Sequence, residues 1–229
     1  FNATINEDGI ATGDLNASDI EGLTDGTYFT VLTNPTHGAA TIHPQSGNWT
    51  YTPSANYFGP DVFKVKVTDD LQGITPAVLH MTVNPVDDPA IITGDFNATI
   101  NEDGIATGDL NASDIEGLTD GTYFTVLTNP THGAATIHPQ SGNWTYTPSA
   151  NYFGPDVFKV KVTDDLQGIT PAVLHMTVNP VDDPAIITGD FNATINEDGI
   201  ATGDLNASDI EGLTDGTYFT VLTPPTHGA

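Results

Sequence analysis

Acidic residues gather in short clusters along the chain, and these clusters are the residues best suited to chemistry. Four of them lie before Pro89, and these are Asn6-Glu7-Asp8, Asp19-Ile20-Glu21, Asp69-Asp70 and Asp87-Asp88. Calcium binds about six to eight oxygen ligands, mainly carboxylates and carbonyls, and tolerates irregular geometry. Like charges held close together are costly unless a cation neutralises them. The clusters therefore predict Ca²⁺ binding, and the alternative is an acidic surface that is simply solvated.

The charge balance narrows the possible partners. The 229 residues include 30 Asp and Glu but only 4 Lys and Arg, which gives a formal net charge of −26. Nucleic acids, anionic membranes and phosphate groups require cationic surfaces, so we expect none of them as a partner, and no insertion of this segment into a membrane. Cysteine is absent, which excludes disulfides, thiolate metal sites and cysteine nucleophiles.

Other reactive residue types give no catalytic pattern. His37, His43 and His80 lack the HxH or HExxH spacing of zinc sites, and no serine stands in a nucleophile elbow. Trp49 and Tyr51 could form a sugar-binding platform, but two aromatic residues on one face of a strand more often pack in a core. We therefore expect no enzymatic activity. Glycosylation stays open at the sequons that begin at Asn2, Asn16 and Asn48.

The chain is built from near-identical repeats. The stretch FNATINEDGIATGDLNASDIEG begins at Phe1 and returns at Phe96 and Phe191, a period of 95 residues (96 − 1 and 191 − 96). Such a period suits a self-contained domain of immunoglobulin size. The proline-rich, acidic stretch VNPVDDPA at 83–90 reads as a linker, because proline ends a β-ladder. We place a first repeat with a truncated first strand at 1–88, a complete repeat at 89–183 and a partial third repeat at 184–229.

Alternation of apolar and polar residues predicts β-strands throughout each repeat. The segments 39–43 and 49–52 read as the arms of a hairpin, 62–68 points Phe63, Val65 and Val67 inward, and 77–83 does the same with Leu79 and Met81. No helical periodicity of useful length is present. Six or seven short strands separated by turn residues predict an all-β, antiparallel sandwich.

Several motifs together resemble the bacterial cadherin-like, or tandem-95 (VCBS-type), Ig-like repeat found in large RTX-type biofilm adhesins. They are NED at 6–8, SDIEG at 18–22, THG at 36–38, WTYTP at 49–53, NYFGPDVFKVKVTDD at 56–70 and VNPVDDP at 83–89. The resemblance covers the whole period. It implies Greek-key β-sandwich repeats arranged end to end, with calcium commonly bound where domains meet.

Strand lengths predict where the acids would converge, because the loops of a sandwich gather at its two ends. The first junction would contain Glu7, Asp87, Asp88, Asp114, Glu116, Asp164 and Asp165, and the second Glu102, Asp182, Asp183, Asp209 and Glu211. Asp114 and Glu116 resemble the D-x-D of cadherin repeats, and Asp87-Asp88-Pro89 resembles their acidic linker. The linker offers fewer ligands than the D-x-N-D-N form, and Glu replaces the second Asp of the pair. Fewer ions per junction, or ions held within one domain, therefore remain alternatives.

Near-identical copies favour a repeated structural task, because a spacer or a polyvalent surface gains from each copy. We expect structural extender or adhesion repeats of a large extracellular surface protein or fibre, stiffened by Ca²⁺ at the junctions. The alternative is that the repeats bind other copies of the same chain and build filaments, or bind glycans. A specific prompt for self-assembly is the stretch 191–229, which is too short to close a sandwich and would expose strand edges.

Overall fold

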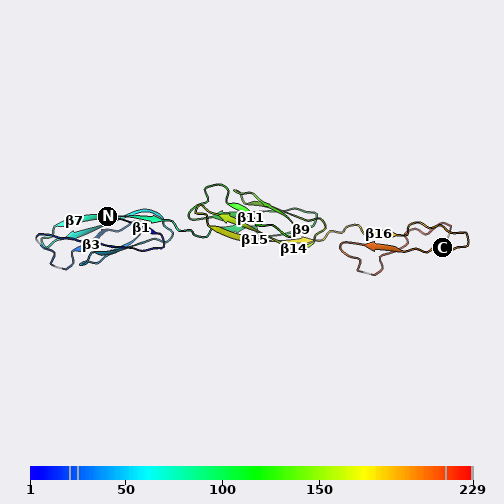
Figure 1. Cartoon of the computed structure of the whole chain (residues 1–229), viewed down its shortest axis with the longest axis horizontal. Coiled ribbons are helices and arrows are strands. Elements are labelled where there is room, and N and C mark those ends of the chain that lie inside the picture. Colours follow the sequence, from blue (N-terminus) through cyan, green and yellow to red (C-terminus); the bar gives the residue numbers. More distant parts are fainter. Residues whose placement is uncertain (21, 25, 215, 228–229) are drawn as a thin grey trace. The chain divides into compact units, whose positions relative to one another are not determined.

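A computed structural model describes residues 1–20, 22–24, 26–214 and 216–227, and all regular elements in this part of the chain are β-strands. None of the described residues forms a helix long and apolar enough to cross a membrane. The strands of the first repeat (Figure 1) are β1 (Asn2–Asn6), β2 (Ala11–Asp14), β3 (Phe29–Thr33), β4 (Gly38–Ile42), β5 (Asn48–Pro53), β6 (Gly59–Thr68) and β7 (Ile74–Asn84).

The first repeat is a sandwich of two sheets with strand orders β1-β7-β6-β3 and β2-β5-β4. β4 pairs antiparallel with β5, as the hairpin pattern predicts, and β6 also pairs antiparallel with β7. The prediction of a wholly antiparallel sandwich is wrong in one respect, because β1 runs parallel to β7, with Asn2 opposite His80 and Asn6 opposite Asn84. Parallel partners need a long connection rather than a tight turn, and nearly the whole repeat separates β1 from β7.

Alternation along the strands places the core as predicted. Tyr51 and Phe63 are fully buried, Trp49 is 7% exposed, and Val65 packs in the same cluster. The Tyr51 ring stacks parallel to that of Phe63, at 4° between the planes, and Trp49 meets the edge of the same ring. Trp49 and Tyr51 are therefore core residues, and the sugar-binding platform considered for them has no exposed ring to offer.

The second repeat repeats this sandwich and adds one strand. Its strands are β8 (Ile91–Gly94), β9 (Asn97–Asn101), β10 (Ala106–Ser113), β11 (Phe124–Thr128), β12 (Gly133–Ile137), β13 (Asn143–Pro148), β14 (Gly154–Thr163) and β15 (Ile169–Asn179). The sheets are β11-β14-β15-β9 and β12-β13-β10-β8. β8 pairs with the edge of β10. β10 spans eight residues, whereas β2, which begins at the equivalent alanine of the first repeat, spans four. Pairing with β8 thus accompanies the longer strand.

The third repeat holds two strands among its described residues, β16 (Ile186–Gly189) and β17 (Leu205–Ser208), which pair antiparallel. The sequence NATIN is strand β1 or β9 in the first two repeats but is irregular at 192–196. Its partner there would be the equivalent of β7, which this stretch does not contain. Tertiary pairing, rather than local propensity, decides whether this sequence becomes a strand.

The chain divides into two compact units that do not follow the repeats. One unit comprises 1–91 together with the loops 113–121 and 163–170, and the other comprises 92–112, 122–162 and 171–229. The linker and two loops of the second repeat thus belong to the same unit as the first sandwich. All predicted residues of the first junction lie in the first unit, and all those of the second junction lie in the second unit.

Candidate metal centre

Glu7 lies in the tight turn that follows β1. The Gly9 amide donates to the Asn6 carbonyl at 2.9 Å, and the Glu7 amide donates to the Asn84 carbonyl at 3.1 Å. These bonds direct the side chain inward, where it is only 4% exposed. Its Oε1 accepts a hydrogen bond from the Val86 amide of the linker at 2.6 Å, whereas Oε2 is buried without a hydrogen-bond partner. One oxygen therefore fixes the linker and the other is left for a further ligand.

Asp114 and Glu116 occupy the loop that follows β10. Asp114 Oδ1 accepts from the amides of Glu116 at 3.0 Å and Gly117 at 3.1 Å, an arrangement that folds the loop around the carboxylate. Glu116 Oε2 accepts from the Asp88 amide at 3.2 Å. The remaining oxygens, Asp114 Oδ2 and Glu116 Oε1, are buried and lack hydrogen-bond partners. The loop thus repeats the arrangement at Glu7, with one oxygen engaged and one unsatisfied.

Three carboxylates from three separate segments converge here. Glu7, Asp88 and Glu116 each offer an oxygen, and these oxygens all lie within 4.8 Å of one another. Burial first, and then the charge of Asp114, raise the pKa of Glu116, although the Asp88 amide acts in the opposite direction. Buried polar atoms are almost always satisfied in native proteins, and a carboxylate is costly to bury unpaired. This oxygen-only set is what a hard cation such as Ca²⁺ prefers.

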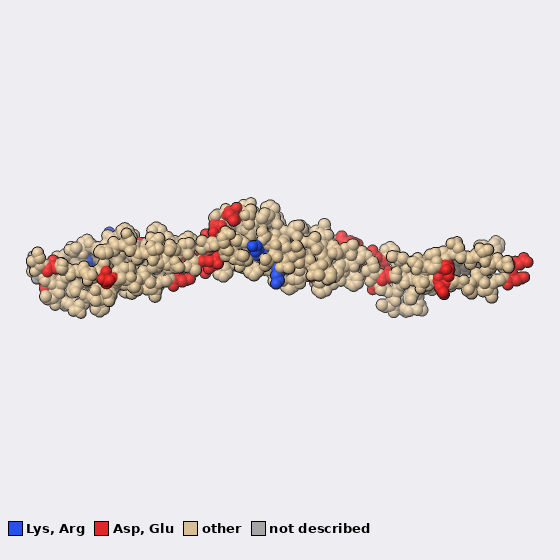
Figure 2. Space-filling model, viewed as in Figure 1, with Lys and Arg blue, Asp and Glu red and all other residues tan. Residues whose placement is uncertain are grey.

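No lysine lies among these carboxylates. Lys64 and Lys66 are on β6, and Lys159 and Lys161 are on β14, away from the loops. Figure 2 shows few basic side chains beside many acidic ones on the visible face. The turn at 6–9, the linker at 85–90 and the loop at 114–121 thus contain no basic residue.

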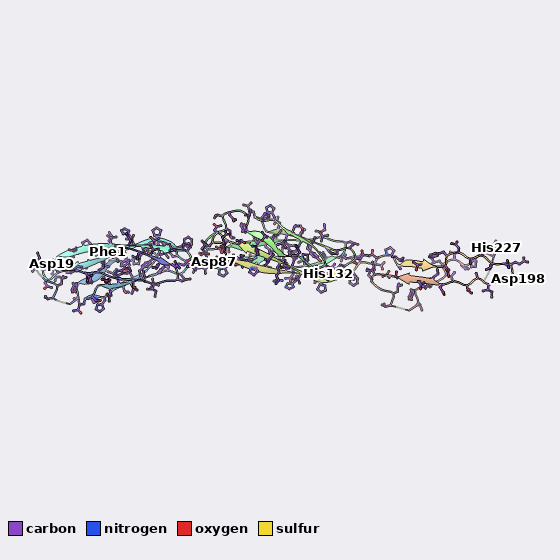
Figure 3. The ribbon with its side chains drawn as sticks, viewed as in Figure 1. Phe1, Asp19, Asp87, His132, Asp198 and His227 are labelled. Atoms are coloured by element: carbon purple, nitrogen blue, oxygen red, sulfur yellow. The ribbon has the colours of Figure 1, made fainter. Side chains whose placement is uncertain are left out.

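Asp87 belongs to a second group, next to Asp164. Asp87 lies on the linker after β7 (Figure 3) and is exposed, whereas Asp164 is 1% exposed. The pKa of Asp87 is raised, by burial first and then by the charge of Asp164 and a hydrogen bond with it. Asp164 Oδ1 accepts from the amides of Leu166 and Gly168, and a Cβ at Gly168 would clash with both carboxylates. Glycine therefore permits this close approach.

Asp165 is engaged elsewhere. Its carboxylate accepts from the Thr119 amide at 2.9 Å and from the Thr119 hydroxyl at 2.6 Å, and these bonds lower its pKa. The structure thus gives Asp165 the role of joining two loops and does not bring it into the group of Glu7, Asp88 and Glu116. Its assignment as a metal ligand stays a prediction without a geometric argument.

The second predicted junction repeats the hydrogen bonds of the first, although among the described residues only Glu7, Asp88 and Glu116 bring carboxylate oxygens within 4.8 Å of one another. Glu102 Oε1 accepts from the Val181 amide at 2.6 Å, and Glu211 Oε2 accepts from the Asp183 amide at 3.2 Å. Glu102 Oε2 and Glu211 Oε1 are buried without partners. Asp209 Oδ1 accepts from the Glu211 amide at 3.0 Å, and Asp182 is exposed. Of the first repeat's own SDIEG loop, Glu21 lies outside the described residues.

Asp61 is a buried carboxylate that the reading of the sequence missed. It is 4% exposed and accepts hydrogen bonds from the amides of Thr36, His37 and Val62 and from the Tyr51 hydroxyl, at 2.8–3.0 Å. Asp156 is bound in the same way in the second repeat. The burial of Asp61 could have been predicted from the alternation along β6, since Asp61 lies on the same inward face as Phe63 and Val65. Because these four hydrogen bonds join separate segments of the repeat, this carboxylate organises the fold.

The stability of the chain should therefore fall in acid through Asp61 and Asp156. Burial raises the pKa of Asp61, but the three amides and the Tyr51 hydroxyl outweigh it, so the folded pKa lies below its usual range. Such a group stabilises the fold above the unfolded pKa of about 3.9, and the contribution is lost as the pH falls through the folded pKa. We expect the melting temperature to drop below about pH 4. A variant with Asp61→Asn and Asp156→Asn should have a shallower acid limb, and an unchanged limb would contradict this assignment.

The comparisons with known proteins agree with this architecture. The bacterial Ig domain family matches residues 2–82 and 87–177. The extracellular cadherin domains 1–5 of protocadherin gamma B2 superpose with a TM-score of 0.61 at 12% identity, over 92% of this chain and 44% of that one. The mouse cadherin-23 domains EC22–24 superpose with a TM-score of 0.53 at 12% identity, over 80% of this chain and 64% of that one.

A structure of protocadherin gamma B7 domains EC3–6, described as a cis-dimer, has a TM-score of 0.60 at 13% identity, over 92% of this chain and 54% of that one. The chain thus spans about half the length of the protocadherin structures it matches. A search of curated proteins finds no match. At these identities the cadherin structures establish a shared fold, and the family is established by the two tandem matches. The chain belongs to the bacterial Ig domain family.

Proposed function

We propose that the chain is a series of structural extender or adhesion repeats from a large extracellular surface protein or fibre, in which Ca²⁺ bound near each linker stiffens the connection between repeats. The observation that carries the proposal is the set of buried carboxylate oxygens without hydrogen-bond partners, on Glu7, Asp114 and Glu116. They come from two loops, the turn after β1 and the loop after β10, and the chain has no thiolate to offer a softer metal.

Each carboxylate in this proposal has two tasks. Glu7 holds the Val86 amide with one oxygen and offers the other to the ion, and Glu116 does the same with the Asp88 amide. Asp88 supplies a third carboxylate within 4.8 Å, and Asp87, Asp114 and Asp164 are the further candidates. The bound ion would supply positive charge. Because the linker and both loops contribute ligands, its binding would order all three segments at once.

The repeat pattern supports a structural role over a catalytic one. The units at 1–88 and 89–183 each end in the same acidic linker, and the partial unit at 184–229 follows the second of these linkers. The net charge of −26 suits a soluble surface protein that binds cations and not nucleic acid. Extracellular placement follows in this proposal from the bacterial Ig family and from the millimolar calcium that weak oxygen sites require.

Calcium should raise the melting temperature of the chain and EGTA should lower it. With Ca²⁺ at about 100 times its dissociation constant, mass action stabilises the ordered state by about 2.7 kcal/mol. Calorimetry measures the change, and isothermal titration gives the number of ions per chain. Magnesium at the same concentration is the control for ionic strength, because its smaller octahedral shell fits carboxylate clusters less readily.

Stiffening is a separate readout of the same titration. Small-angle scattering should show a better-defined maximum dimension in calcium than in EGTA. A melting temperature and a scattering curve that are both indifferent to calcium would overturn the proposal. A higher melting temperature in calcium without a change in scattering would support ion binding but would contradict the stiffening of the linker.

A further inference from the structure

All four basic residues of the chain lie on the same surface of the fold, the outward face of the sheet β1-β7-β6-β3 and of its copy β11-β14-β15-β9. The buried residues of β6 alternate with Lys64 and Lys66, so both lysines point away from the core. Lys159 and Lys161 take the same positions on β14. β6 is an interior strand between β7 and β3, so these lysines do not serve to block a sheet edge, where lysine is often found.

This outward face carries no negative charge. Lys64 lies opposite Val78, and Lys66 lies opposite Pro76, on β7. Asp61 is the only acid in the four strands β1, β3, β6 and β7, all of which the structure describes, and it faces the core. In a chain with 30 acids, the outward face of this sheet thus has two positive charges and no negative one. We call it the basic face of the repeat.

Exposed aliphatic side chains lie beside these lysines. Val62, two residues before Lys64 on β6, is 38% exposed, and Leu32 on β3 is 48% exposed. Their equivalents Val157 and Leu127 are 38% and 47% exposed, so both repeats present the same surface. Apolar side chains gain free energy from contact with other apolar groups. Together with the lysines they favour a protein surface that bears carboxylates over a partner that offers charge alone.

The other sheet of the same sandwich bears a complementary charge. On the outward face of β2-β5-β4, Asp14 lies opposite Asn48. A row of three threonines crosses this face, with Thr50 opposite both Thr12 and Thr41, and the Thr41 and Thr50 hydroxyls lie 2.7 Å apart. None of these three strands, which the structure describes in full, contains a lysine or an arginine. We call this surface the aspartate face of the repeat.

The second repeat has the same aspartate face. Asp109 takes the place of Asp14 on β10, and the Thr136 and Thr145 hydroxyls lie 2.8 Å apart. The Asp109 amide donates to Asp95 Oδ2 at 3.3 Å, which brings a second exposed carboxylate to the edge of this sheet. Each of the two sandwiches therefore presents lysines on one side and aspartate on the other.

We propose that the basic face of one copy of this chain binds the aspartate face of a second copy, with Lys64 and Lys66 beside Asp14. Two sheets that pack face to face lie about 10 Å apart, which lets the threonine methyl groups of one copy cover Val62 and Leu32 of the other. Each copy has both kinds of face, so the contact is heterologous, and copies add side by side into an open stack. The contact does not rest on the proposed metal centre.

The net charge of −26 does not forbid this contact. At an ionic strength of about 0.15 M, charges in water are screened beyond about 8 Å, so the nearest opposed side chains decide whether two surfaces attract. A face of four strands about 4.8 Å apart and about six residues long covers roughly 400 Å². That area is about half of the roughly 800 Å² per partner that stable complexes bury. We therefore expect a weak contact for one repeat and a firmer one when two repeats engage together.

Exchanging the charges of the two faces tests the contact. One full-length variant carries Asp14→Lys and Asp109→Lys, and the other carries Lys64→Glu, Lys66→Glu, Lys159→Glu and Lys161→Glu. In sedimentation at about 0.15 M salt, the unmodified chain should show a mass that rises with concentration. Each variant alone opposes like charges and should stay at the monomer mass. An equimolar mixture restores opposite charges at the contact and should regain the rising mass.

A second pair of variants separates the basic face from the total charge. One replaces all four lysines by glutamine, and the other carries Gln45→Glu, Gln72→Glu, Gln140→Glu and Gln167→Glu. Both make the chain more negative by the same amount, and the four glutamines are exposed and lie outside the strands of both faces. The lysine variant should lose the association and the glutamine variant should retain it. Equal loss in both, a charge-exchanged mixture that stays monomeric, or an unmodified chain that is monomeric at all concentrations would overturn the proposal.

Two further arms distinguish other partners and the metal centre. Alginate is the probe for an anionic polysaccharide, and a monomeric chain that binds alginate through its lysines would overturn the proposal and assign the basic face to a polysaccharide. The sedimentation series is run in EGTA and in calcium, and we expect association in both. Association in calcium alone would contradict the proposed contact. Association in both, without any change of melting temperature in calcium, would contradict the metal centre and support this contact.

Discussion

Replacing Asp61 by alanine is expected to lower the free energy of unfolding of the first repeat by about 3 kcal/mol. The carboxylate accepts from three backbone amides and from the Tyr51 hydroxyl, all beneath the sandwich surface. Alanine leaves the three amides without this acceptor and leaves the Tyr51 hydroxyl only the His37 carbonyl at 3.5 Å. Each buried unsatisfied donor costs about 1–3 kcal/mol, reduced where water enters. Burial and the hydrogen bond to Asp61 also raise the pKa of Tyr51, so the two groups act as one network.

The repeats provide their own internal control for this measurement. Asp156→Ala removes the same network from the second repeat, and each repeat carries one tryptophan, Trp49 or Trp144, in its core. We expect tryptophan fluorescence to show that the repeat carrying the substitution unfolds at the lower denaturant concentration. This is the first repeat in Asp61→Ala and the second repeat in Asp156→Ala. Asp8→Ala, at an exposed position, should change little. Equal stability of Asp61→Ala and Asp8→Ala would contradict the role of the network.

Neutralising Glu7 and Glu116 together should have opposite effects with and without calcium. In EGTA the double variant Glu7→Gln, Glu116→Gln should melt above the original chain, because it removes two buried charges that face Asp88 and Asp114 without a counter-ion. In saturating calcium it should melt below the original chain, because the ligands are gone. Most of the calcium-induced stabilisation at the first linker, about 2.7 kcal/mol at 100-fold excess, should disappear, whereas Glu102 and Glu211 keep any response at the second linker.

The change in melting temperature should have opposite signs in EGTA and in calcium, and this reversal distinguishes a metal-binding site from a structural hydrogen-bond network. Glutamine keeps an oxygen for the Val86 and Asp88 amides, so the loops retain their hydrogen bonds. Asp8→Asn, beside Glu7 but exposed, is the matched control and should retain the full calcium response. If the double variant lost stability equally in EGTA and in calcium, these carboxylates would be structural and the metal centre would be wrong.

Much of the fold follows from the alternation of residue types. The inward positions of Phe63, Val65, Leu79 and Met81 and the hairpin near Trp49 are as the period of two predicts. The parallel pairing of β1 with β7 could not be predicted from this alternation, because alternation identifies the buried face of a strand and not its partner. The irregular copy of NATIN at 192–196 makes the same point within one chain.

The sequence predicted where the candidate site lies better than it predicted which carboxylates form it. Acid clusters and the linker identified Glu7, Asp88, Asp114 and Glu116, because loops at one end of a sandwich must meet. The separate pairing of Asp87 with Asp164, and of Asp165 with Thr119, depends on side-chain hydrogen bonds that spacing does not encode. Asp61 was missed because an acid in an inward position contradicts the simple pattern, and only its four donors explain it.

The parallel pairing of β1 with β7 has a mechanical consequence. Tension that reaches the beginning of β1 and the end of β7 slides the two strands past each other along their length, because the pair is parallel. The bonds between Asn2 and Asn6 on one strand and His80 and Asn84 on the other are then loaded together rather than one after another. Forced unfolding depends on the height of the barrier to unfolding and not on equilibrium stability. The parallel pairs of the first two repeats, β1 with β7 and β9 with β15, are thus arranged to resist pulling in shear.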